Sequence, residues 1–572
     1  MMFCKSIRYI SIISVVVFCF IISAAHASKT EAEFTATHKS AIASAHPLAT
    51  QAGREILEAG GNAFDAAIAV AASLAVVEPY SSGLGGGGFF LLHRNKDGFE
   101  TMIDARETAP LKASSDMYLD KQGNAISSAS KNGPIAAGIP GIPAAFEHLA
   151  KKYGRLPLKE SLAPAIRYAK EGFTVTERYR LLTGYRLKLL QQNPSAAAIF
   201  LQNGELPDAG FLVTQSDLAD VFTVIAENGA KAFYQGDIAK KLVKGVNKQG
   251  GIWTLGDLES YTVIERPPVR GQYRDMQITG AALPSSGGIV LIDTLNILAN
   301  YDLKRFDRAQ QVHLIVEAMR RAYRDRAEFL GDSDFVDVPV DRLIHPYYAS
   351  GQAASIRLDK ATASTALPGA AVNPVGDDTT HFSIIDSEGN RVAATLSINF
   401  PFGCGYVAPG TGILLNNEMD DFAAKAGVPN GYGLVAGADN PNSIQPGKRM
   451  LSSMSPTFVE TKGRIAVIGT PGGSRIISMV LQAVLQFHDG ASAETIVATP
   501  RFHHQFLPDQ IMYEPGTFVV DTQRELQLRG HQLREHERPY GNMQVVIFDK
   551  QTSDLHAASD PRGEGSALVW SQ

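Results

Sequence analysis

The residues best suited to chemistry lie where a stretch rich in alanine, proline and glycine meets a strand-like segment. The sequence there reads Asp378-Thr379-Thr380, and a threonine pair by itself indicates only that a β-strand begins. Ser397 and Asn399 follow at the spacing of residues that share one face of a strand. A threonine freed by cleavage would carry a hydroxyl nucleophile and its own α-amine, whose pKa of about 8 lets it take up the hydroxyl proton. Thr379 is therefore a candidate nucleophile that requires no cysteine, catalytic histidine or metal.

Other signatures of enzyme chemistry are missing or misplaced. Residues 83–88 contain a formal G-x-G-x-x-G, but a helical pattern precedes it and a strand follows, which reverses the order of a dinucleotide site. We read these glycines as backbone that must approach another element closely. No G-K-[ST], G-x-S-x-G, H-E-x-x-H or C-x-x-C motif occurs. The adjacent His503 and His504 have diverging side chains, so we expect a structural pair. We predict no metal and no cofactor.

Composition narrows the class further. The chain has 572 residues, a formal net charge of −5 and 45% hydrophobic residues, which excludes a disordered or fibrous protein. A mildly acidic balance without a basic block argues against nucleic acid as a partner. Three cysteines are too few for a disulfide framework or a four-thiolate metal site. Cys404 has no charged neighbours in sequence, so we expect a small filler residue rather than a reactive thiol.

The N-terminus predicts export. Lys5 and Arg8 precede an apolar run that ends in Ala25-His26-Ala27, an A-x-A cleavage site. We predict a signal peptide over residues 1–27 and a periplasmic or secreted protein. No later stretch is long and apolar enough to span a membrane, so we expect no stable membrane insertion.

Hydrophobic periodicity predicts the elements that position these residues. The expected helices are Pro47–Ala59, Ala63–Val77, Pro143–Tyr153, Lys159–Glu171, Gln310–Leu330 and Ile476–Phe487. The expected strands are Phe89–Arg94, His381–Asp386, Arg391–Ile398, Ile465–Ile468 and Met543–Phe548. Residues 387–390 would form a hairpin loop between the second and third of these strands. We expect residues 361–378, which lack periodicity, to be exposed and flexible.

Further motifs accompany Thr379 in order along the chain. They are Ser82–Phe89, Asp104–Glu107, Thr379–Ser383, Gly389–Val392, Ser397–Asn399, Phe402-Gly403, Gly412–Phe422, Leu451–Thr457, Pro471–Ile476 and Pro500–Gln505. Together they resemble the signature of the gamma-glutamyltranspeptidases (glutathione hydrolases), which are N-terminal-nucleophile hydrolases. The resemblance covers essentially the whole chain after the signal peptide.

This resemblance implies an α+β fold, the four-layer αββα sandwich of the N-terminal-nucleophile hydrolases. It also implies a precursor that cuts itself between Asp378 and Thr379. The products would be a large subunit, residues 28–378, and a small catalytic subunit, residues 379–572, which share one core.

The resemblance also assigns catalytic roles. Thr379 would attack the γ-glutamyl amide carbonyl, and Ser397 would orient its hydroxyl. Many members of the family have threonine at the position of Ser397, and serine lacks the methyl group that restrains the rotamer. We therefore expect an altered rate rather than lost activity. Gly472 and Gly473 would supply the oxyanion hole, because glycine lets backbone N–H groups approach the developing charge.

The predicted substrate pocket must hold an α-carboxylate and an α-ammonium group. By resemblance, the carboxylate ligands are Arg106, Ser452 and Ser453, and the ammonium acceptors are Asn399, Glu418 and Asp421. An arginine fork suits a carboxylate. The Gly-, Asn- and Pro-rich stretch between Asp421 and Ser452 resembles the family's lid loop, with Tyr432 as the lid tyrosine, and long loops of this kind are commonly functional.

The expected activity is transfer of the γ-glutamyl group of glutathione and related compounds to water or to an amino-acid or dipeptide acceptor. Two alternatives remain open at this point. One is a cephalosporin or glutaryl acylase of the same superfamily, and the other is an inactive binding protein on the same scaffold.

Overall fold

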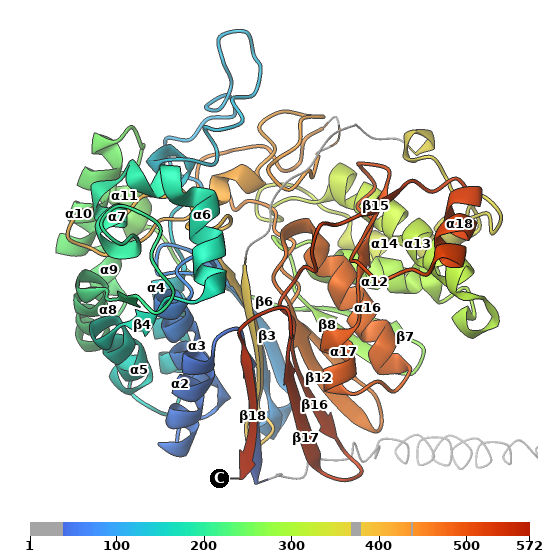
Figure 1. Cartoon of the computed structure of the whole chain (residues 1–572), viewed down its shortest axis with the longest axis horizontal. Helices are drawn as coiled ribbons and strands as arrows, with labels where there is room; N and C mark the ends of the chain where they lie inside the picture. Colours follow the sequence, from blue (N-terminus) through green and yellow to red (C-terminus); the bar gives the residue numbers. More distant parts are fainter. Residues whose placement is uncertain (1–37, 368–378, 436, 438, 572) are drawn as a thin grey trace, which may run out of the picture. The chain divides into compact units, whose positions relative to one another are not determined.

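Two antiparallel β-sheets lie face to face at the centre of the unit formed by Ala36–Gln572. The computed structural model describes residues 38–367, 379–435, 437 and 439–571. The predicted signal peptide, and Asp378 on one side of the predicted cleavage site, lie outside the described residues. Within this unit, Figure 1 shows helices α2 to α11 on one side of the sheets and helices α12 to α18 on the other. The layers therefore follow the predicted αββα order.

The first sheet contains β9, the strand that begins directly after the candidate nucleophile Thr379. Its strands, in spatial order, are β18 (Ser566–Ser571), β1 (Lys39–Ser44), β9 (Thr380–Ile385), β10 (Arg391–Ser397), β2 (Gly87–Arg94), β3 (Phe99–Asp104) and β6 (Ile264–Arg266). The second sheet consists of β17 (Asp554–Ser559), β16 (Gln544–Asp549), β12 (Arg464–Gly469), β11 (Thr457–Glu460), β8 (Met276–Gly280) and β7 (Val269–Tyr273). There are two small sheets. One pairs β4 (Phe173–Thr174) with β5 (Leu212–Val213), and the other has the spatial order β13 (Phe502–His503), β14 (Ile511–Tyr513) and β15 (Leu533–Glu535).

Helices cover the outer face of each sheet. The first layer comprises α2 (Pro47–Glu58), α3 (Ala63–Val77), α4 (Ile142–Lys152), α5 (Leu158–Glu171), α6 (Glu177–Gln191), α7 (Pro194–Phe200), α8 (Ser216–Asn228), α9 (Lys231–Tyr234), α10 (Asp237–Lys248) and α11 (Leu255–Glu259). The second comprises α12 (Gly287–Leu298), α13 (Arg308–Phe329), α14 (Val340–Leu343), α15 (Pro346–Ala353), α16 (Ile476–His488), α17 (Ala493–Ala498) and α18 (Val520–Leu528). Helix α3 packs on β9 and β10, while α12 and α16 pack on the second sheet.

Helix α3 shows how sequence produces this packing. Asn62 and Asp65 form a reciprocal capping box at its start, which satisfies backbone N–H groups that have no helical partner. All fifteen residues of α3 are buried, and most are small or apolar. A helix that is apolar on every side must be covered on every side, and α3 accordingly lies between the sheet and helices α2 and α5.

The glycines at residues 85–88 pack against strand β10 and neighbouring backbone. A Cβ atom on Gly86 would clash with the carbonyl oxygen of Ser397, and one on Gly87 would clash with the Glu107 side chain. This confirms the interpretation of these glycines as a site of close backbone approach.

All eleven elements predicted from periodicity are present, with ends within two residues of the predicted ones. The prediction that residues 361–378 are exposed is wrong at Ser364, whereas Ala363, Thr365 and Ala366 are exposed. Ser364 is fully buried, its backbone N–H donates to Asp509, and its hydroxyl donates to the carbonyl oxygen of Phe506. Residues 368–378 lie outside the described residues. In the part of the chain that the structure describes, none of the helices has the length and apolar character needed to cross a bilayer.

Candidate active site

One pocket gathers the predicted site residues. Its lining consists of Arg106, Thr379, Ser397, Asn399, Glu418, Asp421, Tyr432, Ser452, Ser453, Met454, Gly473 and Ile476. Every predicted substrate-binding and catalytic residue is in this list except Gly472, which immediately precedes Gly473. These side chains come from positions as far apart as 106 and 476, so only the fold brings them together.

The hairpin of β9 and β10 positions the candidate nucleophile. Thr380 pairs with Leu396 across the two strands, and the next step of this antiparallel register places Thr379 opposite Ser397. Both residues are buried, and each is 4% exposed. The neighbouring Thr380 hydroxyl donates to the carboxylate of Glu78 at 2.7 Å. The two threonines are therefore distinguished by their contacts: Thr379 lines the pocket, whereas Thr380 is bonded to helix α3's C-cap residue.

Asn399 adopts a strained backbone conformation two residues after the end of β10. Its φ is +75°, in the left-handed region that asparagine tolerates better than most residues. Its backbone N–H donates to Ser397 Oγ at 2.7 Å, and its side-chain amide donates to the carbonyl of Asn417 at 2.9 Å. This arrangement leaves the Asn399 Oδ1 atom as a hydrogen-bond acceptor, consistent with its predicted contact to an ammonium group.

Arg106 forms the charged centre of the pocket. It follows β3, is 1% exposed, and donates through Nη1 to Glu418 Oε2 at 2.6 Å and through Nη2 to Asp421 Oδ2. Glu418 and Asp421 belong to a short 3₁₀-helix, residues 418–421. Burial disfavours the charge on Arg106, but Glu418, Asp421 and Glu107 together raise its pKa above the usual value. The guanidinium therefore stays charged.

The acidic side of this cluster is strongly desolvated. Burial raises the pKa of Asp421 to about 7, against the opposing effect of Arg106. Glu107 lies 3.6 Å from Arg106 and has no hydrogen-bond partner for either carboxylate oxygen within the described residues. Burial, reinforced by Glu418, raises the pKa of Glu107 well above its ordinary value. A group with one carboxylate and one ammonium can replace the internal pairing, with its carboxylate on Arg106 and its ammonium on Glu418 and Asp421.

Ser452 and Ser453 present hydroxyl groups to the same pocket. Ser452 Oγ accepts a hydrogen bond from the Met454 backbone N–H at 3.1 Å, and Ser453 Oγ accepts one from Arg326 at 3.2 Å. Because both oxygens already accept, both hydroxyl protons are available as donors. Two such donors suit a carboxylate.

Gly472 and Gly473 form the turn before helix α16. Their φ values are +138° and +55°, and a Cβ atom on Gly473 would clash with the ring of Tyr432. In the part of the chain that the structure describes, neither backbone N–H group donates a hydrogen bond. Unpaired N–H groups at a helix start can stabilise a negative oxygen, which is the role predicted for this pair.

Tyr432, the predicted lid tyrosine, lines the pocket. Its hydroxyl donates to the carbonyl of Asn399 at 3.0 Å, and its ring stacks on Phe400 with centroids 5.1 Å apart. Gln505 donates to its backbone carbonyl at 3.2 Å, and the Ser474 hydroxyl donates to Gln505 Oε1 at 2.6 Å. The described residues between Asp421 and Ser452 contain no helix or strand, as predicted for a lid loop.

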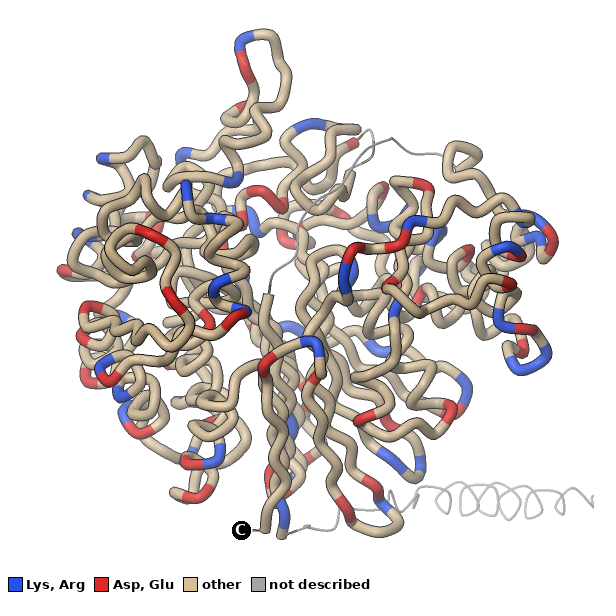
Figure 2. Tube along the Cα trace, in the orientation of Figure 1, with Lys and Arg blue, Asp and Glu red and all other residues tan. Residues whose placement is uncertain are grey.

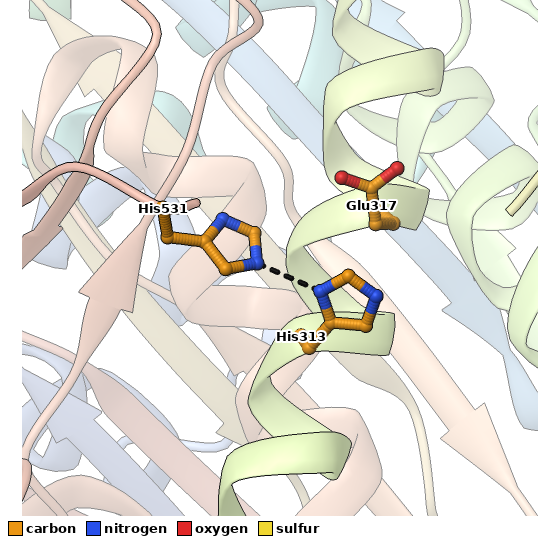
Figure 3. Close-up of side chains that lie close together, drawn as sticks. All are labelled: His313, Glu317 and His531. Atoms are coloured by element: carbon orange, nitrogen blue, oxygen red, sulfur yellow. Dashed lines mark hydrogen bonds between the residues drawn. The ribbon is translucent and has the colours of Figure 1, made fainter. Parts of the chain in front are cut away.

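A cluster of histidines lies elsewhere, between α13 and the loop after α18. Figure 3 shows His313 and Glu317 on one face of α13, with His531 opposite. His313 Nδ1 and His531 Nε2 are 2.8 Å apart and share a hydrogen bond, while Glu317 pairs with Arg320 and Arg321. The facing nitrogens of His313 and His531 are thus bonded to each other, and the Glu317 carboxylate is paired with two arginines. The positive charges of these arginines would repel a bound cation. We read the cluster as structural.

His503 and His504 also have structural contacts. His503 bonds Ser478 and Gln505, whereas His504 bonds Asp509. Burial lowers the pKa of both rings, to about 3 and about 4. The two side chains diverge, as predicted from their adjacency. Cys404 is buried as well, and burial raises the pKa of its thiol to about 12, so it is not a reactive thiolate.

Sequence reasoning missed several residues around the pocket. Met454 and Ile476 line it, and Glu107 and Arg326 contact the residues that line it. Glu107 stands next to Arg106 within a recognised motif and could have been noticed. No signal in the sequence distinguishes Arg326 from the other arginines of its helix.

Comparisons with known proteins agree with this geometry. The sequence model of the family described as gamma-glutamyltranspeptidase matches residues 49–570. The chain belongs to the gamma-glutamyltranspeptidase family. It is 44% identical over 527 residues to the "Glutathione hydrolase proenzyme" of Escherichia coli (strain K12), covering 91% of this chain and 90% of that protein. The protein of the same name from Pseudomonas sp. (strain A14) is 40% identical, with 92% and 94% covered.

Solved structures show the same architecture. The cephalosporin acylase from Bacillus halodurans superposes with a TM-score of 0.82 at 29% identity, covering 93% of this chain and 96% of that one. The αββα sandwich of the N-terminal-nucleophile hydrolases, predicted from the sequence, is confirmed. The gamma-glutamyltranspeptidase fold thus carries both glutathione hydrolases and acylases, so substrate choice must be argued from the pocket.

Proposed function

We propose that this enzyme is a gamma-glutamyltransferase and glutathione hydrolase. The observation that carries the proposal is the pairing of Arg106 with Glu418 and Asp421 in the pocket that Thr379 lines. A γ-glutamyl group ends in a carbon that bears both a carboxylate and an ammonium. This pocket offers opposite charges within hydrogen-bonding distance of each other, which is the complement of that head group.

The reaction begins with attack of the Thr379 hydroxyl oxygen on the γ-amide carbonyl, while the Thr379 α-amine takes the hydroxyl proton. Ser397, opposite in the strand register, orients the hydroxyl. The N–H groups of Gly472 and Gly473 stabilise the oxyanion, where one donor is worth roughly 10²–10³ in rate. The amine proton passes to the leaving amine, and a γ-glutamyl ester remains on Thr379. Water, or the amine of an amino acid or dipeptide, then takes the acyl group and frees the hydroxyl.

The nucleophile requires cleavage between Asp378 and Thr379. The proposed subunits, residues 28–378 and 379–572, would remain together because their strands alternate in one sheet. Strand β1 of the large subunit lies between β18 and β9 of the small subunit, and β10 of the small subunit pairs with β2 of the large one. In the second sheet, β11 of the small subunit also pairs with β8 of the large one, so separating the subunits would break four strand pairings among the described residues and the shared core.

The acylase alternative fits this pocket less well. A glutaryl group has a terminal carboxylate for Arg106 but no ammonium, so Glu418 and Asp421 would face it without a positive partner. A buried charge left unpaired is costly. The inactive-scaffold alternative predicts no turnover with any acyl donor.

Product analysis with glutathione tests the proposal. The purified protein should release glutamate in water and form a γ-glutamyl dipeptide adduct when an acceptor dipeptide is present. N-terminal sequencing should find one chain that begins at Thr379, and Thr379→Ala should remain a single inactive chain. Full activity of an uncleaved wild-type protein would refute the mechanism, and preference for glutaryl over γ-glutamyl donors would favour the acylase.

The proposed location is the periplasm or the medium. The supporting feature is the N-terminal signal pattern, which predicts a mature large subunit that starts at Ser28. Figure 2 shows basic and acidic residues interspersed along the described part of the chain. N-terminal sequencing of the large subunit from fractionated cells tests the location.

A further inference from the structure

Arg326 is a buried cation that the proposed reaction does not use. It lies near the end of α13, is 5% exposed, and burial lowers its pKa to about 10. Within the described residues its guanidinium forms no ion pair; its hydrogen bonds go to two hydroxyl oxygens, Ser286 Oγ at 2.9 Å and Ser453 Oγ at 3.2 Å. Arg106, the buried arginine that lines the pocket, is by contrast paired with carboxylates. A desolvated charge without a paired carboxylate is unusual and needs a reason.

The contacts of Arg326 control the serine pair. Its Nη2 group donates to Ser453 Oγ, so the hydroxyl proton of Ser453 must point elsewhere. Its Nε group donates to Ser286 Oγ, which in turn donates to the carbonyl of Ser452 at 2.7 Å. The Ser286 backbone N–H donates to the same carbonyl at 2.9 Å. One guanidinium thus fixes the backbone of Ser452 and the hydroxyl polarity of Ser453.

The charge of Arg326 also acts on the pocket. The charges of Asp421 and Arg106 both influence the pKa of Arg326. Asp421 and Arg326 also line a second small cavity next to the pocket. A positive charge behind two hydroxyl donors favours an anion in front of them.

We infer that Arg326 is a positioning residue for donor recognition: it directs the Ser453 hydroxyl into the pocket and places a second positive charge behind the α-carboxylate of the donor. The inference rests on the proposed function, because it assumes a γ-glutamyl donor in this pocket. Arg326 contacts the donor only through Ser453.

The test is a cycle that changes the enzyme and the donor together. The donors are γ-glutamyl-p-nitroanilide and the same anilide with its α-carboxylate converted to a carboxamide. Arg326→Gln should raise KM for the first donor by roughly tenfold, the effect of one hydrogen bond to a charged group, while kcat changes by less than about twofold. With the carboxamide donor the same substitution should change kcat/KM by less than about twofold. Ser453→Ala should show the same dependence on the donor.

Controls separate positioning from general damage. Arg324→Gln alters an arginine two residues away that pairs with Asp325, and it should leave both donors unaffected. Arg326→Lys retains the charge and should keep KM for the first donor below that of Arg326→Gln. If Arg326→Gln does not yield folded protein, Ser286→Ala, which removes the acceptor of Arg326 Nε, goes through the same cycle.

The outcomes are distinguishable. A loss of equal size with both donors would overturn the inference and leave a structural role. An inactive wild type would overturn the proposed function itself. A loss confined to the donor with the α-carboxylate supports Arg326 as a positioning residue.

Discussion

Replacing Arg106 tests the charge pairing on which the proposed function depends. Arg106→Ala removes two hydrogen bonds to charged groups, to Glu418 and Asp421. With substrate bound, the arginine fork would instead hold the α-carboxylate. At about 1.5–3 kcal/mol for each charged hydrogen bond, losing two corresponds to about 3–6 kcal/mol, or roughly 10²- to 10⁴-fold in kcat/KM. We expect most of this loss in KM.

The same substitution should destabilise the protein. It leaves Glu418, Asp421 and Glu107 as buried carboxylates without their cation, and breaking a buried pair costs about 3–5 kcal/mol. Arg106→Lys keeps the charge but not the planar fork, so it should retain more stability and activity than Arg106→Ala. Arg155→Ala is the control, because the Arg155–Glu388 pair is about half exposed on both sides and such pairs are worth at most about 1 kcal/mol.

The assays are steady-state kinetics with γ-glutamyl-p-nitroanilide and thermal unfolding, both on protein that has cleaved itself. An Arg106→Ala enzyme that is folded and cleaved, with KM within threefold of the wild type, would refute the assignment of Arg106 to the donor's carboxylate. A fall in kcat at constant KM would instead place Arg106 in the chemical step.

Three further predictions follow from the geometry of the site. Gly473→Ala should reduce kcat by about 10²-fold or more in a stopped-time anilide assay, because alanine at φ +55° is strained and its methyl group would clash with Tyr432. The second prediction concerns pH. Asp421, whose pKa is about 7, is protonated at lower pH and then accepts a hydrogen bond from an ammonium group poorly. The value of kcat/KM should therefore fall as the pH drops through 7. Asp421→Asn should lower kcat/KM and flatten this limb of the pH profile, and a limb that persists in the variant would assign it to another group. Glu78→Gln should weaken the hydrogen bond to Thr380 and slow cleavage into two chains, which is followed on a denaturing gel. The control is Glu58→Gln, which alters an exposed glutamate of α2.

Much of the fold was predictable because its central elements carry local signals. Helix α3 begins at a capping box, and the β9–β10 hairpin turns over a short loop in which Asp386 accepts from the backbone of Glu388 and Asn390. Helix α12 was not predicted. All of its twelve residues are buried, so it lacks a polar face. Helix α3 is just as buried, but α3 starts at a capping box, whereas no side chain caps the start of α12.

Contacts distant in sequence explain two other differences. Composition predicted a flexible segment at Ser364, but Asp509 and Arg320 provide it with charged partners 145 and 44 residues away. Arg326 is similar: its acceptors, Ser286 and Ser453, lie 40 and 127 residues from it. Periodicity identifies the buried face of a helix, but it does not identify the groups that this face will meet.

The position of Thr379 directly before β9 explains how a cut chain could keep a precise site. The residues after Thr379 are held by β1 on one side of β9 and by β10 on the other, and Thr380 is bonded to Glu78. The proposed cleavage before Thr379 would remove one covalent bond but none of these contacts. The new α-amine would therefore appear next to a hydroxyl whose neighbouring strand is fixed by both proposed subunits. Catalysis by an N-terminal threonine needs this combination, because the base and the nucleophile belong to one residue and only the surrounding sheet can orient them.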